Sequence, residues 1–374
     1  MKEPTLSDRI TGAIVGSAVG DALGAPMECM HYKDIRDAFG GVRRFEDFTD
    51  EMLTHSKFTR SVADIGLVTD DTVLADVLLD SIIETDGNVT AYDFARAWEN
   101  LDTPVPNPDG DDVVRLERLH FIEQIPFYRN RLREIQKRDL GRGEANTTSA
   151  IMYIVPVGVL CAGDPLEAEL MAVEITAVNQ HGRPRDVAGG YAAAVAACFQ
   201  PGRAAEEIVK IGVEHTRDAK SVKELRAMIE LAANCTTCDE FIERYYDEIL
   251  DVVIPFQDWE HEGTEYCNSW NCSEVLGPVL GTFLITRGED AEGMILACAR
   301  IGRDADTVCR VGAGLIGAYA GCEAIPKEWR DYVLARNTWL RLEEKARTLT
   351  DIVRTRLRAK IDMSTKLLQR LDRD

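Results

Sequence analysis

The sequence feature that most restricts the fold is a series of four glycines at strict four-residue spacing: Gly12, Gly16, Gly20 and Gly24. Residues four apart lie on one face of an α-helix, and the apolar residues of Leu6–Leu23 follow the same period, which predicts a helix with one bare face. Each glycine costs a helix roughly 1 kcal/mol relative to alanine. Close approach of another backbone best explains the series. Pro26 then helps to end the helix, and Glu28 lies just past its C-terminal end.

Helical periodicity also dominates the rest of the chain. Apolar residues recur at helical spacing in many further stretches, among them Val113–Ile135, Glu274–Ile285 and Ala305–Ala320, whereas alternating strand-like runs are scarce. We therefore expect an all-α fold, a large bundle of packed helices. Because no hinge-like linker is evident, we expect one helical domain over residues 1–326. Residues 327–374 then form a basic, amphipathic helical extension packed on that domain.

The net charge restricts the classes of molecule that the protein can bind. The formal net charge is −21 at pH 7, and a field of that sign repels phosphate backbones, which argues against nucleic-acid binding and favours metal cations. No apolar run approaches the roughly 18 uncharged residues of a membrane span. Several of the ten cysteines lie inside apolar runs, which is typical of buried free thiols in a reducing cytoplasm. We expect a cytoplasmic protein that contacts neither nucleic acid nor membrane.

Two short acidic clusters each stand directly before an apolar helical stretch. They are Thr69-Asp70-Asp71-Thr72 and Asp304-Ala305-Asp306-Thr307. Taken singly, each is typical of ordinary helix capping, in which Thr or Asp binds the first backbone N–H groups. If the two helix starts converge, four carboxylates meet and repel one another unless cations neutralise them. Hard oxygen ligands of that kind suit Mg²⁺, Mn²⁺ or Ca²⁺. The sequence alone leaves both interpretations open.

Five segments occur in a fixed order along the chain: Gly20–Glu28, Thr69–Thr72, His181–Pro184, Asp304–Thr307 and the glycine-rich Gly312–Gly321. In that order they resemble the motifs of the ADP-ribosylglycohydrolase family. Each motif is short, but their joint occurrence in family order is specific, and together they span most of the chain.

The resemblance implies an orthogonal helical bundle with a central cleft that holds two Mg²⁺ ions, with Mn²⁺ as an alternative. The metal ligands that it implies are Thr69, Asp70, Asp71, Asp304, Asp306 and Thr307. Glu28 then moves a proton or positions water. The substrate side that it implies comprises Thr148, Ser149, Met152, His181 and Gly182. Asp21 is expected to cap or brace a buried turn.

The chain departs from the family pattern mainly on the substrate side. Where the family carries Gly-Asn-Gly-x-x-Met-Arg, residues 147–153 read TTSAIMY, so Met152 matches, side chains replace the glycines, and Tyr153 stands in place of the arginine. Arg303 replaces one glycine of a Gly-Gly-Asp motif, and Val68 replaces a tryptophan. The implied metal ligands therefore match the family pattern more closely than the implied ADP-ribose pocket does.

These observations predict a Mg²⁺-dependent hydrolase that cleaves the N- or O-glycosidic bond at the anomeric carbon of a ribose. An ADP-ribosylated protein or a free ADP-ribosyl compound is the first substrate expected. Another ribosyl or nucleoside-like small molecule is the alternative, which the altered 147–153 stretch favours. The rival from another class is a non-catalytic relative that keeps the metals for binding. The loop aromatics Trp259, Tyr266 and Trp270 either stack on a base or sugar, or pack the loop.

Overall fold

The computed structural model describes residues 3–132, 136–254, 267 and 270–371. Within them the expected all-α fold is confirmed: the chain forms 17 α-helices, and its two named strands, β1 (Pro104–Val105) and β2 (Val113–Val114), pair antiparallel. The helices are α1 Leu6–Gly24, α2 Tyr32–Phe39, α3 Asp50–Leu53, α4 Asp70–Glu84, α5 Ala91–Trp98, α6 Phe121–Leu132, α7 Val155–Leu160, α8 Pro165–Ile175, α9 Arg183–Ala197, α10 Ala205–Glu214, α11 Ala219–Ala233, α12 Cys238–Glu248, α13 Ser273–Thr286, α14 Ala291–Ile301, α15 Ala305–Ala320, α16 Lys327–Arg336 and α17 Leu342–Leu371.

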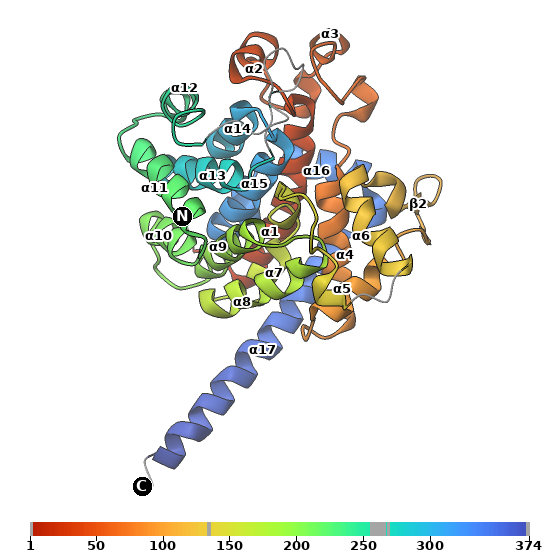
Figure 1. The fold of residues 1–374 in the computed structure, drawn as a ribbon, viewed down its shortest axis with the longest axis vertical. Helices are drawn as coiled ribbons and strands as arrows, with labels where there is room; N and C mark the ends of the chain where they lie inside the picture. Colours follow the sequence, from red (N-terminus) through yellow and green to blue (C-terminus); the bar gives the residue numbers. More distant parts are fainter. Residues whose placement is uncertain (1–2, 133–135, 255–266, 268–269, 372–374) are drawn as a thin grey trace.

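Helices α1 and α15 form the centre of the fold, with other helices packed around them (Figure 1). They run antiparallel, and each glycine of α1 faces a backbone carbonyl of α15. A Cβ atom would lie 2.4 Å from that oxygen for Gly12 and Gly317, 2.9 Å for Gly16 and Ala313, 2.3 Å for Gly20 and Cys309, and 2.3 Å for Gly24 and Ala305. Such distances are far below van der Waals contact, so the close backbone approach predicted from the glycine spacing is confirmed.

Helix α1 is also the one described helix that is long and apolar enough to span a membrane, by length and composition alone. The apolar window, within Leu6–Met27, has a mean hydropathy of 1.2, and 89% of it is buried inside the protein. This burial is that of a core helix, because neighbouring helices and not lipid cover its surface.

The stretch predicted as one helix over Val113–Ile135 is interrupted. Val113 and Val114 pair with Val105 and Pro104 in the small hairpin, a 3₁₀ turn follows at Arg115–Arg118, and α6 begins only at Phe121. The prediction was wrong for its first part because apolar residues at helical spacing are also compatible with a short buried strand.

The C-terminal helix α17 divides into two parts. In its first half Leu342, Leu349 and Val353 are buried, and Lys345 pairs with Asp76 and Asp80 of α4, so this half packs on the body. From residue 358 to residue 371 every residue is exposed. Figure 1 shows this second half projecting away from the body. The extension therefore packs on the body mainly through the first half of α17, whereas residues 358–371 are exposed.

Candidate metal centre

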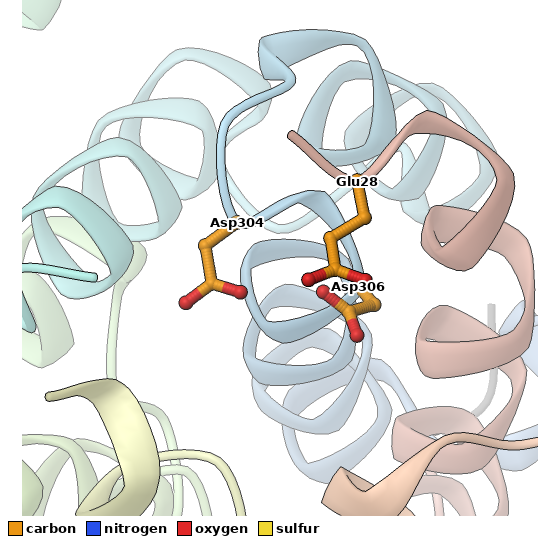
Figure 2. Close-up of side chains that lie close together, drawn as sticks. All are labelled: Glu28, Asp304 and Asp306. Atoms are coloured by element: carbon orange, nitrogen blue, oxygen red, sulfur yellow. The ribbon is translucent and has the colours of Figure 1, made fainter. Parts of the chain in front are cut away.

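The two acidic clusters converge in one pocket, together with Glu28. Carboxylate oxygens of Glu28, Asp304 and Asp306 lie within 4.8 Å of one another, and Figure 2 shows Glu28 and Asp306 facing each other beside Asp304. The pocket has a volume of about 340 Å³, and its lining includes the other implied ligands, Thr69, Asp70, Asp71 and Thr307. The antiparallel pairing of α1 and α15 causes this meeting, because it brings the end of one helix to the start of the other.

Two backbone hydrogen bonds fasten the loop after α1 to the loop before α15. The N–H of Cys29 donates to the carbonyl of Arg303 at 2.6 Å, and the N–H of Arg303 donates to the carbonyl of Met30 at 2.9 Å. Cys29 and Arg303 both have φ near +59°, which costs a residue with a side chain some strain. The Nε of Arg303 pairs with a carboxylate oxygen of Glu274 at 2.5 Å. This ion pair fixes the side chain of Arg303, which replaces a glycine of the family pattern.

Asp21 holds the start of α4 from within α1. Its carboxylate accepts hydrogen bonds from the backbone N–H of Thr69 at 3.1 Å, from the Thr69 hydroxyl at 2.8 Å and from the backbone N–H of Thr72 at 3.2 Å. The Thr72 hydroxyl also donates to it. The expected bracing role of Asp21 is confirmed, and the effect is to fix Asp70 and Asp71 against the end of α1.

Arg310 of α15 connects this brace to the substrate side. Its Nη1 donates to the Thr72 hydroxyl at 2.6 Å, and its Nε donates to the carbonyl oxygen of Met152. Arg310 is almost completely buried, so its charge faces Asp21 with little screening by water. The Asp21–Thr72–Arg310 network thus ties α1, α4 and α15 to residue 152.

The carboxylates of the pocket destabilise one another's charges. Burial raises the pKa of Asp71 and Asp306 well above the usual range, and neighbouring carboxylates raise it further. Burial and the Asp304 charge likewise raise the pKa of Glu28. Burial raises the pKa of Asp70 to about 8, and the charge of Glu123 adds to the effect. These acids cannot all ionise together because their charges repel one another. A bound cation would stabilise their ionised forms.

Unpartnered oxygens point to the same need. Oδ2 of Asp71, Oδ2 of Asp304 and Oδ1 of Asp306 are buried and have no hydrogen-bond partner among the described residues. Capping explains Thr69, whose hydroxyl accepts from the Asp71 N–H at 3.3 Å. It does not explain Asp304, which precedes α15 without a side-chain capping bond. Bare carboxylate oxygens are the ligands that Mg²⁺ and Mn²⁺ take, so the donor set fits such cations.

The metal-free protein should lose stability as the pH rises from about 5 to about 8. The cluster carboxyls have pKa values raised in the folded state, that of Asp70 to about 8, so over this window the folded chain binds more protons than the unfolded chain. The free energy of unfolding then falls with rising pH. Mg²⁺ should remove most of that fall, since cations replace the protons.

Thermal unfolding across this pH window, in chelator and in Mg²⁺, measures the effect. The variant Asp71→Asn should flatten the slope in chelator, because it removes one of the shifted groups. Equal slopes with and without Mg²⁺ would contradict the cation site.

The predicted substrate-side residues divide into two groups. Thr148, Ser149 and Met152 line the pocket. His181 and Gly182 do not belong to its described lining; His181 Nδ1 lies 3.2 Å from the carbonyl oxygen of Gly141.

The neighbours of His181 support the segment that does line the pocket. The Asn179 side chain donates to the Ser149 carbonyl at 3.3 Å and accepts from the Tyr153 hydroxyl at 2.6 Å. The amide group of Gln180 donates to the Thr147 hydroxyl at 3.0 Å. Tyr153 therefore braces this segment from a buried position and does not line the pocket.

Sequence reasoning missed Glu123 and His120, which also line the pocket. Glu123, buried in the first turn of α6, accepts a hydrogen bond from the Ser149 hydroxyl. It lies 3.6 Å from His120 Nδ1 and raises the pKa of that imidazole. In sequence, an acid in the first turn of a helix is indistinguishable from dipole compensation. Trp270 lines the pocket as well, whereas Trp259 and Tyr266 lie outside the described residues.

Comparisons with known proteins show which family the chain is similar to. Residues 2–359 match the model of the ADP-ribosylglycohydrolase family. The ADP-ribosyl-[dinitrogen reductase] glycohydrolase of Rhodospirillum rubrum is 23% identical over 88% of this chain and 91% of its own. YegU of Escherichia coli K12 is 23% identical over 85% of this chain and 90% of its own.

A solved structure shares the fold. It is titled ADP-ribosylglycohydrolase-related protein complex, covers 94% of this chain and all of its own, and superposes with a TM-score of 0.59 at 21% identity. The family match covers nearly the whole chain. The chain therefore belongs to the ADP-ribosylglycohydrolase family.

Proposed function

We propose that this protein is a divalent-metal-dependent hydrolase that cleaves the glycosidic bond at the anomeric carbon of an ADP-ribosyl group, on a protein or on a small molecule. One observation carries the proposal: carboxylates from three separate segments meet in one pocket, and several of their buried oxygens lack any protein partner among the described residues. Family membership supports the reaction class.

The residues of the pocket would have different roles in the reaction. The ligand set Thr69, Asp70, Asp71, Asp304, Asp306 and Thr307 would hold the cations. Bound there, Mg²⁺ or Mn²⁺ supplies Lewis-acid chemistry that orients sugar hydroxyls and makes water more acidic. Glu28 reaches into the same pocket, where its carboxyl group moves a proton between water and the departing group. Carboxylates around the sugar stabilise positive charge that develops at the anomeric carbon.

The test is an assay of the metal-stripped chain with and without added Mg²⁺ or Mn²⁺. Substrates are arginine- and serine-linked ADP-ribosyl peptides, a free ADP-ribosyl compound and a nucleoside, and chromatography detects the released sugar. We expect release to require the divalent ion. Tight metal binding with no product from any ribosyl substrate would instead favour the non-catalytic relative.

A smaller ribosyl compound is the second candidate substrate, and the 147–153 segment favours it. The hydroxyls of Thr147 and Ser149 lie 2.7 Å apart, and Ser149 donates to the Glu123 carboxylate. Side chains therefore stand where the family has glycines, and the negative charge of Glu123 lies beside them. An anionic diphosphate entering on this side meets both.

Glu123→Gln should separate the two substrates. Glutamine still accepts the Ser149 hydrogen bond but removes the charge, so the KM for an ADP-ribosyl compound should fall about tenfold, equivalent to ~1.4 kcal/mol. The KM for an uncharged ribosyl compound should change little. Asp102→Asn, which removes a surface charge paired with Arg131, is the control. Equal KM changes for both compounds would show that Glu123 does not select against the diphosphate.

A further inference from the structure

The second half of α17, residues 358–371, is an arm whose residues are all exposed in a single chain, with Lys360 at its base paired to Asp164 and Glu167 (Figure 1). Its large apolar side chains are in water: Ile361 is 66% exposed, Leu368 61% and Leu371 68%. Residues 358–371 span about 21 Å as a helix. An isolated helix of this length is only marginally stable in water. Exposed leucines on such a helix indicate a surface that is covered in the working protein.

Three of the five large apolar residues of the arm lie on one seam, and Met363 and Leu367 lie beside it. The seam consists of Leu357, Ile361, Ser364, Leu368 and Leu371, spaced alternately by four and three residues as in a coiled coil. Leu357 precedes the arm and is half-buried against the body. In helical angle, the seam nearly continues the stripe of Leu342, Ala346, Leu349 and Val353 that the body buries. The face that the body covers in the first half of α17 thus stays open in the second half.

The order of residues in the seam fits a second copy of the same seam. In an antiparallel pair centred on Ser364, Leu357 lies level with the partner's Leu371, and Ile361 lies level with the partner's Leu367, next to its Leu368. The small Ser364 meets its own copy at the centre, where the two helices approach. Because every contact is then repeated by symmetry, the pair closes as a two-fold dimer. We propose that the arm pairs antiparallel with the arm of a second copy of this chain.

Exposed apolar residues of α8 lie beside the start of the arm, where the C-terminal end of the partner's arm would pack. Lys360 pairs with Asp164 and Glu167, which places the start of α8 beside the base. On α8, Leu166 and Leu170 are 52% and 61% exposed. An antiparallel partner brings the apolar residue Leu371 and the basic residue Arg370 to this end.

Net charge supports the same arrangement. The whole chain carries a formal charge of −21, although 13 basic and 8 acidic residues follow position 326. A basic arm that reaches from one copy to the acidic body of another is attracted to it.

Light scattering on the full chain at micromolar concentration tests the proposal. We expect twice the mass of one chain. Leu368→Glu should return the mass to that of one chain while the thermal transition of the body stays unchanged, because Leu368 makes no contact with its own body. Gln369→Glu adds the same charge off the seam and should leave the dimer intact. A wild-type monomer at every concentration, or a dimer that Leu368→Glu does not weaken, would overturn the proposal.

Cysteine cross-linking tests the direction of the pair. Under oxidation, Ser364→Cys should give a covalent dimer and Gln369→Cys should not, with the parent chain as the background for its ten native thiols. Ile361→Cys alone should not cross-link, whereas a mixture of Ile361→Cys and Leu368→Cys chains should. Cross-linking of Ile361→Cys to itself would mean a parallel pair and would overturn the antiparallel arrangement.

Discussion

Replacing Asp304 by asparagine is expected to abolish turnover and leave the fold intact. Oδ2 of Asp304 has no hydrogen-bond partner among the described residues, whereas Oδ1 accepts a hydrogen bond from the Thr307 hydroxyl at 3.0 Å. Asparagine keeps that acceptor and removes the charge that a cation needs. Losing a metal contribution of several kcal/mol corresponds to about a thousand-fold in rate or more.

Stability should move in the opposite direction in this variant. Without metal, removing one of several crowded carboxylates relieves repulsion, so the melting temperature of metal-free Asp304→Asn should equal or exceed that of the wild type. Asp290→Asn is the matched control, because Asp290 also stands at a helix N-terminus, where it caps α14. It should retain full activity. Full activity of Asp304→Asn would remove the proposed mechanism.

Replacing Gly20 by alanine is expected to cause the largest loss of stability. The new Cβ would lie 2.3 Å from the Cys309 carbonyl oxygen and 2.7 Å from the Ala313 Cβ. These are backbone and near-backbone atoms, so α1 and α15 must separate. Overpacking of this kind costs about 3 kcal/mol. Chemical denaturation of both chains measures it.

The same separation should weaken metal binding at a distance from the substituted residue. Glu28 follows α1 and Asp304 precedes α15, so moving the two helices apart opens the distance between their carboxylates. We expect lower metal affinity in the still-folded fraction of Gly20→Ala. Gly41→Ala, at a position with nothing within 4 Å of the added Cβ, should change neither quantity by a measurable amount. Wild-type stability of Gly20→Ala would contradict the role given to the glycine series.

The parts of the fold that were predictable from sequence are those encoded by regular spacing. The four glycines predicted a close helix–helix contact, and apolar periodicity predicted most of the helices. The spacing could not reveal that α15 is the partner, because nothing local records which distant backbone fills the bare face. The open half of α17 was missed for a similar reason. Its apolar stripe looks the same whether the body or another chain covers it.

For the candidate site, too, the sequence predicted the local features but not the contacts between distant segments. Both acidic clusters were identifiable because Thr and Asp precede long apolar helical stretches, although only the structure shows that they converge. The pairing of Cys29 with Arg303 was invisible, since hydrogen bonds between backbones of distant loops leave no mark on residue type. Arg303 looked like a plain departure from the family, and its pairing with Glu274 explains how a side chain is accommodated there. Glu123 was hidden as an ordinary first-turn acid.

Crystals of the chain soaked in Mn²⁺ would locate the bound ions through the anomalous diffraction signal of manganese, which tests whether the two acidic clusters share a metal centre. We expect two peaks inside the pocket, contacting carboxylate oxygens of both Asp70–Asp71 and Asp304–Asp306, with Glu28 beside them. Crystals of Asp304→Asn should lose at least one peak. A map without manganese in this pocket, or with manganese bound only elsewhere on the acidic surface, would mean that the two acidic clusters do not form a metal centre.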